Sequence, residues 1–443
     1  MDRMKIAVVT PKMRGDERGG AENLYEGLVN ALNEAGHIAT QINVVVDESS
    51  FESILEAYCN CFYLDLNDYD LVISTKAPTY MVRHRNHISY LLHTIRVFYD
   101  MFDVEFNPKD KEKQKQRKLI HKFDKYGLHP SRIKKHCVIG ETVAKRLKDA
   151  DPFWDLINFE VIYPASTISD FNEPKEGEFI FLSGRLHRWK RVDLAIKAMK
   201  YVPHDIKLLI AGKGEDAEEF KKLAKRLKLE DKIEFLGFVS DDELFELYSR
   251  AIVVPYTPKS EDFGYITLEA FKSKKPVITC FDSGEPTYIV QEGISGFVVE
   301  PDPQKIAEKI NYLIDNPDEA KRMGENGYNS VQDVTWENAV LRLLSDVVIQ
   351  PEEKVTPKIN VLITDMQPIE PAIGGGRLRL KGLYSNLPPN IKALYVGTYD
   401  WKGPKHRKIQ ISRSFLELDI PLDNEHFRLN EHLNRLLPGK TII

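Results

Sequence analysis

The chain has 443 residues, of which 42% are hydrophobic and 29% are charged, and its formal net charge is −5. This composition is typical of a folded, water-soluble protein and excludes binding to nucleic acid through bulk positive charge. The four cysteines lack the paired spacing of a zinc site or a disulfide framework. No apolar run is long enough for a membrane span, and the N-terminus does not resemble a signal peptide, so we expect a cytoplasmic protein.

The first part of the chain alternates short apolar strands with helices. Strands are predicted at residues 5–10, 38–46 and 69–75, and a helix near 21–36 carries leucines at helical spacing. A glycine-rich loop ending in Gly19 and Gly20 joins the first strand to this helix. Free backbone N–H groups at such a helix start can bind an anion, although a plain turn is the simpler interpretation.

Two polar segments follow in the same part of the chain. His93, Arg96, Tyr99 and Asp100 recur at helical spacing, so a helix is predicted over this stretch. Residues 109–125 are rich in lysine and arginine. A solvated helix is one interpretation of this segment, and contact with an anionic membrane on the cytoplasmic face is the other.

A polar stretch at 169–178 is the predicted linker to a second α/β domain. The alternation that follows predicts strands at 179–184, 206–212, 233–238, 251–256, 276–280 and 296–300, and helices near 191–200, 216–228, 241–249, 265–273 and 303–315. The α/β fold class expected is therefore two facing Rossmann-like domains, at residues 1–170 and 171–350. Ligands of such sheets bind at the carboxyl ends of the strands, so we expect the site in a cleft between the domains.

Basic residues follow the first strand of the second domain. Gly184 ends the strand, Arg185 comes directly after it, and Lys190 stands five residues beyond Arg185. Both cations suit a diphosphate, arginine as a planar fork and lysine as a point charge. Basic residues near strand ends are also common on surfaces, and the pattern alone does not separate these interpretations.

The stretch "SEDFGYITLEA" places Glu261 and Glu269 on either side of a helix start. Backbone N–H groups of Gly264, Tyr265 and Ile266 lack helical partners there and can bind phosphate. A capping carboxylate followed by a solvated glutamate is the simpler interpretation. Gly284 precedes a further predicted helix start.

The tail from 351 to 443 begins as a linker and then repeats the order strand, glycine-rich loop, helix. This order is that of residues 4–35. We therefore predict an α/β extension that is the possible start of a second module of the same kind.

Taken together and in order, these motifs resemble the retaining GT-B glycosyltransferases of family 4, the glycosyl transferases group 1. The resemblance runs from residue 5 to about 348. Its motifs are Gly19 to Glu22, the run Gly184, Arg185, Leu186 with Lys190, and the pair Glu261 and Glu269 with Phe263 and Gly264 between them.

The resemblance implies that the first domain binds a glycan or glycolipid acceptor and the second binds a nucleotide-sugar donor. Arg185 and Lys190 would neutralise the departing diphosphate in place of a metal. Glu261 would hold hydroxyls of the donor sugar, and Glu269 those of the ribose. His93 would contact the sugar or the acceptor. No bound cofactor, metal or nucleic acid is implied. The helix near 336–348 is expected to cross back to the first domain.

The chain also departs from the family pattern. Glu285 stands where the family often has a second glycine, and Ile95 and Tyr99 replace a proline and a tryptophan of one subgroup. Two rival functions are an epimerase that acts on nucleotide-sugars and an inactive module that binds nucleotide or glycan.

Overall fold

The computed structural model describes residues 3–13, 20–166, 172–203, 205–349, 359–365, 368–369, 375–388, 390–399, 407–412 and 414–421. The chain divides into two compact units. One comprises Met1–Cys61 and Leu71–Ile349, and the other comprises Phe62–Asp70 and Gln350–Ile443. Gly19 and both predicted domain boundaries, near 170 and 350, lie outside the described residues.

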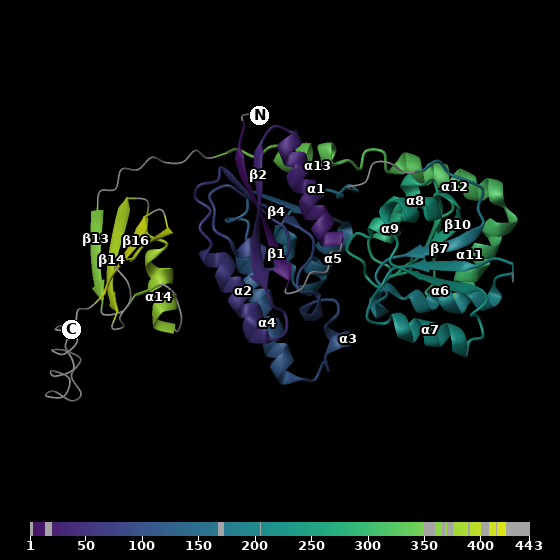
Figure 1. Cartoon of the computed structure of the whole chain (residues 1–443), viewed down its shortest axis with the longest axis horizontal. Helices are drawn as coiled ribbons and strands as arrows, with labels where there is room; N and C mark the ends of the chain where they lie inside the picture. The colour runs from purple at the N-terminus through teal and green to yellow at the C-terminus, as the bar shows by residue number, and fades with distance from the viewer. Residues whose placement is uncertain are drawn as a thin grey trace. The chain divides into compact units, whose positions relative to one another are not determined.

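The first sheet is parallel and has the strand order β2-β1-β3-β4-β5-β6 (Figure 1). The strands β3 and β4 are buried along their whole length, as expected for a parallel sheet covered on both faces. The elements are β1 (Lys5–Met13), α1 (Gly20–Glu34), β2 (Ile38–Val46), α2 (Phe51–Tyr63), β3 (Leu71–Ser74), β4 (His87–Leu91), α4 (Lys111–Gly127), β5 (Lys135–Val138), α5 (Glu141–Ala150) and β6 (Glu160–Val161).

The predicted helix around His93 is wrong. The chain ends β4 at Leu91 and then forms a loop with a short 3₁₀ turn, η2 (Arg96–Phe98), before the four-residue helix α3 (Phe102–Glu105). β4 is buried along its whole length, but its sequence HISYL includes His87 and Ser89 and so lacks the continuous apolar run that marks a central parallel strand. The basic segment does form the helix α4.

The second sheet is also parallel, with the order β12-β11-β10-β7-β8-β9. Its elements are β7 (Phe179–Ser183), η4 (Arg188–Lys190), α6 (Val192–Ala198), β8 (Leu208–Ala211), α7 (Ala217–Arg226), β9 (Ile233–Gly237), α8 (Asp241–Ser249), β10 (Ala251–Pro255), α9 (Tyr265–Lys272), β11 (Val277–Cys280), α10 (Pro286–Ile289), β12 (Gly296–Val299), α11 (Pro303–Asp315) and α12 (Pro317–Ser330). These strands and helices match the predicted ranges closely, apart from α12.

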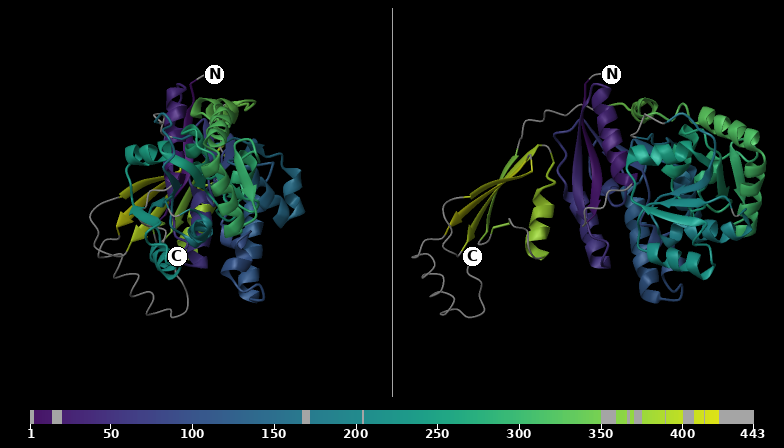
Figure 2. Two further views of the ribbon diagram at one scale, coloured as in Figure 1. Left: turned by 90° about the vertical axis from the view of Figure 1, so that its right-hand side faces the viewer. Right: turned by 45° about the vertical axis from the view of Figure 1, so that its right-hand side comes forward.

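The order of this second sheet places β7 beside β10, where the chain reverses its direction of travel across the sheet. Figures 1 and 2 show helices on both faces, with α6 and α7 on one side and α8 and α9 on the other. A buried cluster that includes Ile180, Leu208, Val253 and Ile306 fills the space between sheet and helices. Ligands in such folds bind outside the carboxyl ends of strands at the reversal point, here the loops after β7 and β10.

Helix α13 (Trp336–Leu344) packs on the first domain, as the resemblance implied. The Trp336 ring lies against Gly27 of α1, so close that a methyl group there would overlap it. Arg342 binds Glu160 through its Nε, 3.0 Å from Oε1, and donates to the carbonyl of Val161. The last helix of the first unit therefore fastens the second domain to the first.

The other unit holds a four-stranded sheet of order β13-β14-β16-β15. Its elements are β13 (Ile359–Asp365), α14 (Gly375–Tyr384), β14 (Ile391–Tyr399), β15 (Arg407–Ser412) and β16 (Phe415–Pro421). The predicted strand and helix are present, and β13 pairs with β14 in parallel. An antiparallel β15–β16 hairpin follows instead of a further α/β repeat. The idea of a second module stays a prediction.

Candidate functional site

Two cations follow β7, but they take different partners. Gly184 has a φ of 123°, which turns the chain out of the strand. The guanidinium of Arg185 pairs with the Glu215 carboxylate and its side chain is 55% exposed. Lys190 instead reaches inward, with Nζ 2.5 Å from Glu261 Oε2 and 3.4 Å from the Tyr256 hydroxyl.

The loop that carries Glu261 is braced by the loop after β11. The Glu261 amide donates to the Ser283 carbonyl at 2.7 Å, and the Glu285 amide donates back to the Glu261 carbonyl at 2.9 Å. Gly284 adopts a φ of 80°, and a Cβ there would lie 2.4 Å from the Glu261 carbonyl oxygen. In this structure Gly284 thus supports the backbone of the Glu261 loop.

Helix α9 begins directly after this loop with Gly264 as its N-cap, at a φ of 81°, and no side chain caps it. Ile266 packs against Gly184, and Glu269 lies one turn further along the helix. The Glu269 carboxylate accepts a hydrogen bond from Tyr248 at 3.0 Å, and Tyr248 also contacts Ser183. Burial raises the pKa of Glu269 to about 7, and the Tyr248 bond opposes this shift.

Aromatic residues of the same loop face the first domain. The ring centroids of Phe263 and Tyr163 lie 5.5 Å apart. The Tyr265 ring lies in contact range of Gly20, since a Cβ on Gly20 would be 3.4 Å from Tyr265 Cδ2. The glycine at the start of α1 therefore meets the start of α9.

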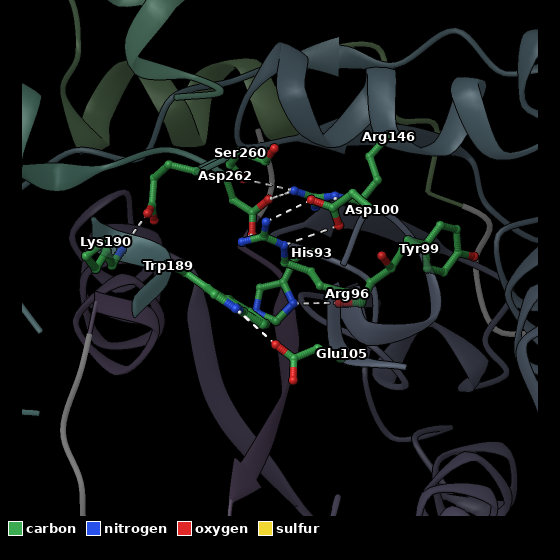
Figure 3. Close-up of polar contacts among 12 residues, drawn as sticks. His93, Arg96, Tyr99, Asp100, Glu105, Arg146, Trp189, Lys190, Ser260 and Asp262 are labelled. Carbon is green, nitrogen blue, oxygen red and sulfur yellow. Dashed lines mark hydrogen bonds and ion pairs between the residues drawn. The ribbon is translucent and has the colours of Figure 1, made fainter. Parts of the chain in front are cut away.

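Figure 3 shows a charged cluster where loops of the two domains meet. The Asp262 carboxylate, from the loop after β10, pairs with Arg146 of α5 and lies 3.9 Å from Arg96 Nη1. Asp100 binds both arginines from the other side, at 2.8 Å in each case. The Arg96 guanidinium also lies 5.2 Å from the centroid of the Trp189 ring.

His93 lies beside this cluster in the loop after β4. Its Nδ1 is 2.7 Å from the Thr94 carbonyl oxygen, which fixes Nδ1 as the protonated nitrogen of a neutral ring. Burial and the nearby cations Lys76, Arg146 and Arg96 hold the pKa of His93 well below its usual range. A neutral His93 leaves Nε2 as a hydrogen-bond acceptor.

Glu285, the departure from the family pattern, has a defined role in the structure. Its carboxylate accepts the backbone N–H of Thr142 at 2.8 Å and the hydroxyl of Tyr163 at 2.9 Å. Helix α5 has Gly140 as its N-cap and no side-chain cap of its own. Glu285 therefore caps a helix of the first domain from the second domain.

A second connection joins the domains at the turn that carries Lys190. The Glu105 carboxylate accepts from Arg188 at 2.8 Å and from the Trp189 indole at 3.2 Å. Glu105 belongs to α3, whereas Arg188 and Trp189 belong to η4. The turn that carries Lys190 is thus held by both domains.

A buried carboxylate organises the loop that carries His93 and Arg96. Asp124 of α4 is fully buried and accepts hydrogen bonds from Tyr58 and Tyr80, both at 2.5 Å, and from Tyr99 at 2.7 Å. Burial raises the pKa of Asp124 to about 6, while the tyrosine hydrogen bonds act in the opposite direction. His121 stacks on Tyr99 and contacts the Phe98 carbonyl.

The structure pairs Lys190 with Glu261, places Gly264 and Glu269 at and within the adjoining helix α9, and puts His93 beside Arg96 and Arg146, whereas Arg185 stays on the surface. Sequence reasoning missed Arg146, Asp262, Glu105, Trp189 and Asp124. Asp262 lies inside the quoted stretch and was available as a candidate, whereas nothing local marks Arg146 on an amphipathic helix. Among the described residues no group of His, Cys, Asp and Glu has the arrangement of a metal site, and no helix could span a membrane.

Comparison with known proteins matches residues 166–330 to the family "Glycosyl transferases group 1". The human alpha-1,3/1,6-mannosyltransferase ALG2 is 29% identical over 216 residues, which are 43% of this chain and 50% of ALG2. The chain thus spans about half the length of the curated relatives it matches.

The matches to solved structures extend over nearly the whole length of those structures' chains. Sucrose-phosphate synthase from Thermosynechococcus elongatus has a TM-score of 0.63 at 19% identity, over 77% of this chain and 97% of that one. HepE from Anabaena, in complex with UDP and glucose, has a TM-score of 0.57 at 17% identity, over 77% and 98%. The expected fold class is confirmed: the two parallel sheets form the GT-B fold of these solved structures, and residues 166–330 resemble the glycosyl transferases group 1 family.

Proposed function

We propose that the chain transfers a hexose from a nucleotide-diphosphate sugar to a hydroxyl of a glycan or glycolipid, with retention of the anomeric configuration and without a metal. The observation that carries this proposal is the Lys190–Glu261 pair at the carboxyl ends of β7 and β10, with Glu269 on the helix α9 that follows. The related ALG2 is a mannosyltransferase and HepE binds UDP and glucose, which supports a nucleotide-sugar donor.

Different residues contact different parts of the donor. Lys190 neutralises charge on the departing diphosphate, and the uncapped N–H groups of α9 add to this. Arg185 contributes after release from Glu215, a pair whose exposure makes it weak. Glu261 accepts hydrogen bonds from hydroxyls of the sugar, and Glu269 from those of the ribose, in the ionised form.

The acceptor side consists of loops of the first domain. His93 Nε2 is unprotonated and contacts the incoming hydroxyl or the donor sugar. No side chain is assigned as a covalent nucleophile, so the acceptor hydroxyl attacks the anomeric carbon from the face that the diphosphate leaves. The bond between the anomeric carbon and the acceptor hydroxyl oxygen forms as the bond to the diphosphate breaks, and the hydroxyl proton passes to an oxygen of the departing diphosphate.

The exposed face of α4 supplies a contact with an anionic membrane. Lys111, Lys115, Lys118 and Lys122 are exposed and recur at helical spacing, so they lie along one face. Each adds about 1 kcal/mol of attraction to an anionic surface. Sedimentation with phosphatidylserine vesicles tests this, and equal binding by wild type and the Lys115→Glu, Lys118→Glu double variant would contradict it.

The donor assignment is tested by nucleotide release over a panel of UDP-, GDP- and ADP-sugars. We expect release with one class of donor, and a strong loss in Glu261→Gln but not in Glu246→Gln. Glu246 pairs with Lys175 elsewhere in the same domain and is the matched control. Equal release by wild type and Glu261→Gln with every donor would contradict the assignment. Conversion of donor without acceptor would instead indicate an epimerase.

A further inference from the structure

Three cations of the first domain lie near His93. Lys76 follows β3, Arg96 lies in the loop after β4, and Arg146 lies on α5. The side chains of Arg96 and Arg146 are only 11% and 3% exposed. All three cations lower the pKa of His93, which places them within electrostatic range of its ring.

The carboxylates that pair with these arginines come from both domains. Asp100 belongs to the same loop as Arg96 and binds both arginines. Asp262 comes from the loop after β10 of the second domain and pairs with both arginines (Figure 3). The neighbouring Glu261 already forms an ion pair with Lys190. If Asp262 left, Arg146 and Arg96 would share one carboxylate between them and positive charge would be in excess.

The hydrogen-bonding capacity of Arg146 is not filled even with Asp262 in place. Within the described part of the chain, its Nη1 is buried and has no hydrogen-bond partner, and the same holds for the hydroxyl of Thr94 beside His93. Buried polar groups are nearly always satisfied in folded proteins, so this guanidinium nitrogen is available to donate to a ligand. The ligand that fits such a group is an anion with several acceptor oxygens.

We propose that Arg96 and Arg146 bind a phosphate group of the acceptor, and that Asp262 occupies this position while the acceptor is absent. This inference rests on the proposed function, because it names the class of acceptor. Two arginine forks match the oxygens of a phosphate better than one carboxylate does. Both arginines belong to the first domain, whereas the donor diphosphate is assigned to Lys190 and α9 of the second.

The exchange links acceptor binding to the donor site. A buried guanidinium left without a counter-charge is strongly unfavourable, so Asp262 leaves only when another anion replaces it. Asp262 lies between Glu261 and Phe263, and its release frees the loop that positions Glu261. An acidic acceptor therefore loosens the contact that holds this loop against α5.

The test is a calorimetric titration of the full chain with inorganic phosphate. We expect phosphate to bind Asp262→Asn at least about fivefold more tightly than wild type, since the internal competitor is gone. Arg146→Gln should lower the affinity about tenfold in either background, whereas Lys145→Gln should not. Lys145 is the adjacent, exposed cation of α5 and pairs with Asp149. Circular dichroism confirms that each variant is folded.

Competition with UDP identifies the source of the phosphate. Simultaneous binding of UDP and phosphate to Asp262→Asn supports the acceptor assignment. Exclusion of phosphate by UDP, or phosphate binding that Arg146→Gln leaves unchanged, overturns it. Donor-dependent nucleotide release is measured in parallel. Normal release with no phosphate site refutes this inference alone, whereas a phosphate site without release refutes the proposed function.

Discussion

In both sheets of the first unit, loops at the carboxyl ends of the strands carry charged side chains, but these loops are held in place by different means. After β7, β10 and β11, glycines with positive φ at 184, 264 and 284 let loops approach each other closely, and short stretches of sequence supply Lys190, Glu261 and Glu269. After β4, the His93 loop is instead held by buried side-chain hydrogen bonds from α4, centred on Asp124. The second domain therefore depends on backbone geometry, and the first on a polar network whose members are distant in sequence.

Among the changes outside the Lys190 site, the largest effect is expected at the point where the two arrangements meet. Gly140 precedes α5, and a Cβ there would lie 2.5 Å from Glu285 Cδ and 2.6 Å from the Asp262 carbonyl oxygen. Gly140→Ala must therefore displace the loop that carries Glu261. We expect sugar transfer to fall about 10²-fold, because displacements near 1 Å suffice for that loss. A rate within twofold of wild type would show that loop placement does not matter.

The donor side alone is tested by Glu269→Gln. Loss of charge-assisted hydrogen bonds to the ribose should raise the donor KM by roughly 10- to 100-fold. In wild type, burial raises the pKa of Glu269 to about 7. The ionised form, and with it donor affinity, is therefore lost as the pH falls through 7. The donor KM should rise below pH 7 in wild type and stay flat in Glu269→Gln. Identical pH profiles would contradict the ribose role.

The polar network of the first domain is tested by Asp124→Asn. Asparagine cannot accept from three tyrosine hydroxyls as the carboxylate does, so we expect the free energy of unfolding to fall by about 1–3 kcal/mol. Urea denaturation measures this, with the exposed Asp155→Asn as control. An unchanged midpoint in Asp124→Asn would mean that the network does not stabilise the domain.

The smallest effect is expected at the cap between the domains. Glu285→Gln keeps one acceptor oxygen but loses the charge at the start of α5, so stability should fall by about 1 kcal/mol. Thermal unfolding provides the measurement. A variant as stable as wild type would show that the cap that Glu285 provides for α5 does not stabilise the contact between the domains.

This contrast also explains what could be predicted from the sequence. Strands and helices of the second domain were located closely, and Lys190, Glu261 and Glu269 follow strands within short motifs. Arg146 and Asp124 lie on helices with no local signal, because their partners come from distant segments. The loop at His93 was mistaken for a helix since its polar spacing imitates helical periodicity, while β4 is buried on both faces.

Lys190 provides the most direct test of the central claim, that the donor diphosphate lies at the carboxyl ends of β7 and β10. The measurement is the single-turnover rate of sugar transfer in Lys190→Ala and in the control Lys197→Ala, whose lysine pairs with Asp193 on α6. The account predicts a fall of about 10²–10³-fold in Lys190→Ala and none in the control. Equal rates in the two variants would contradict it.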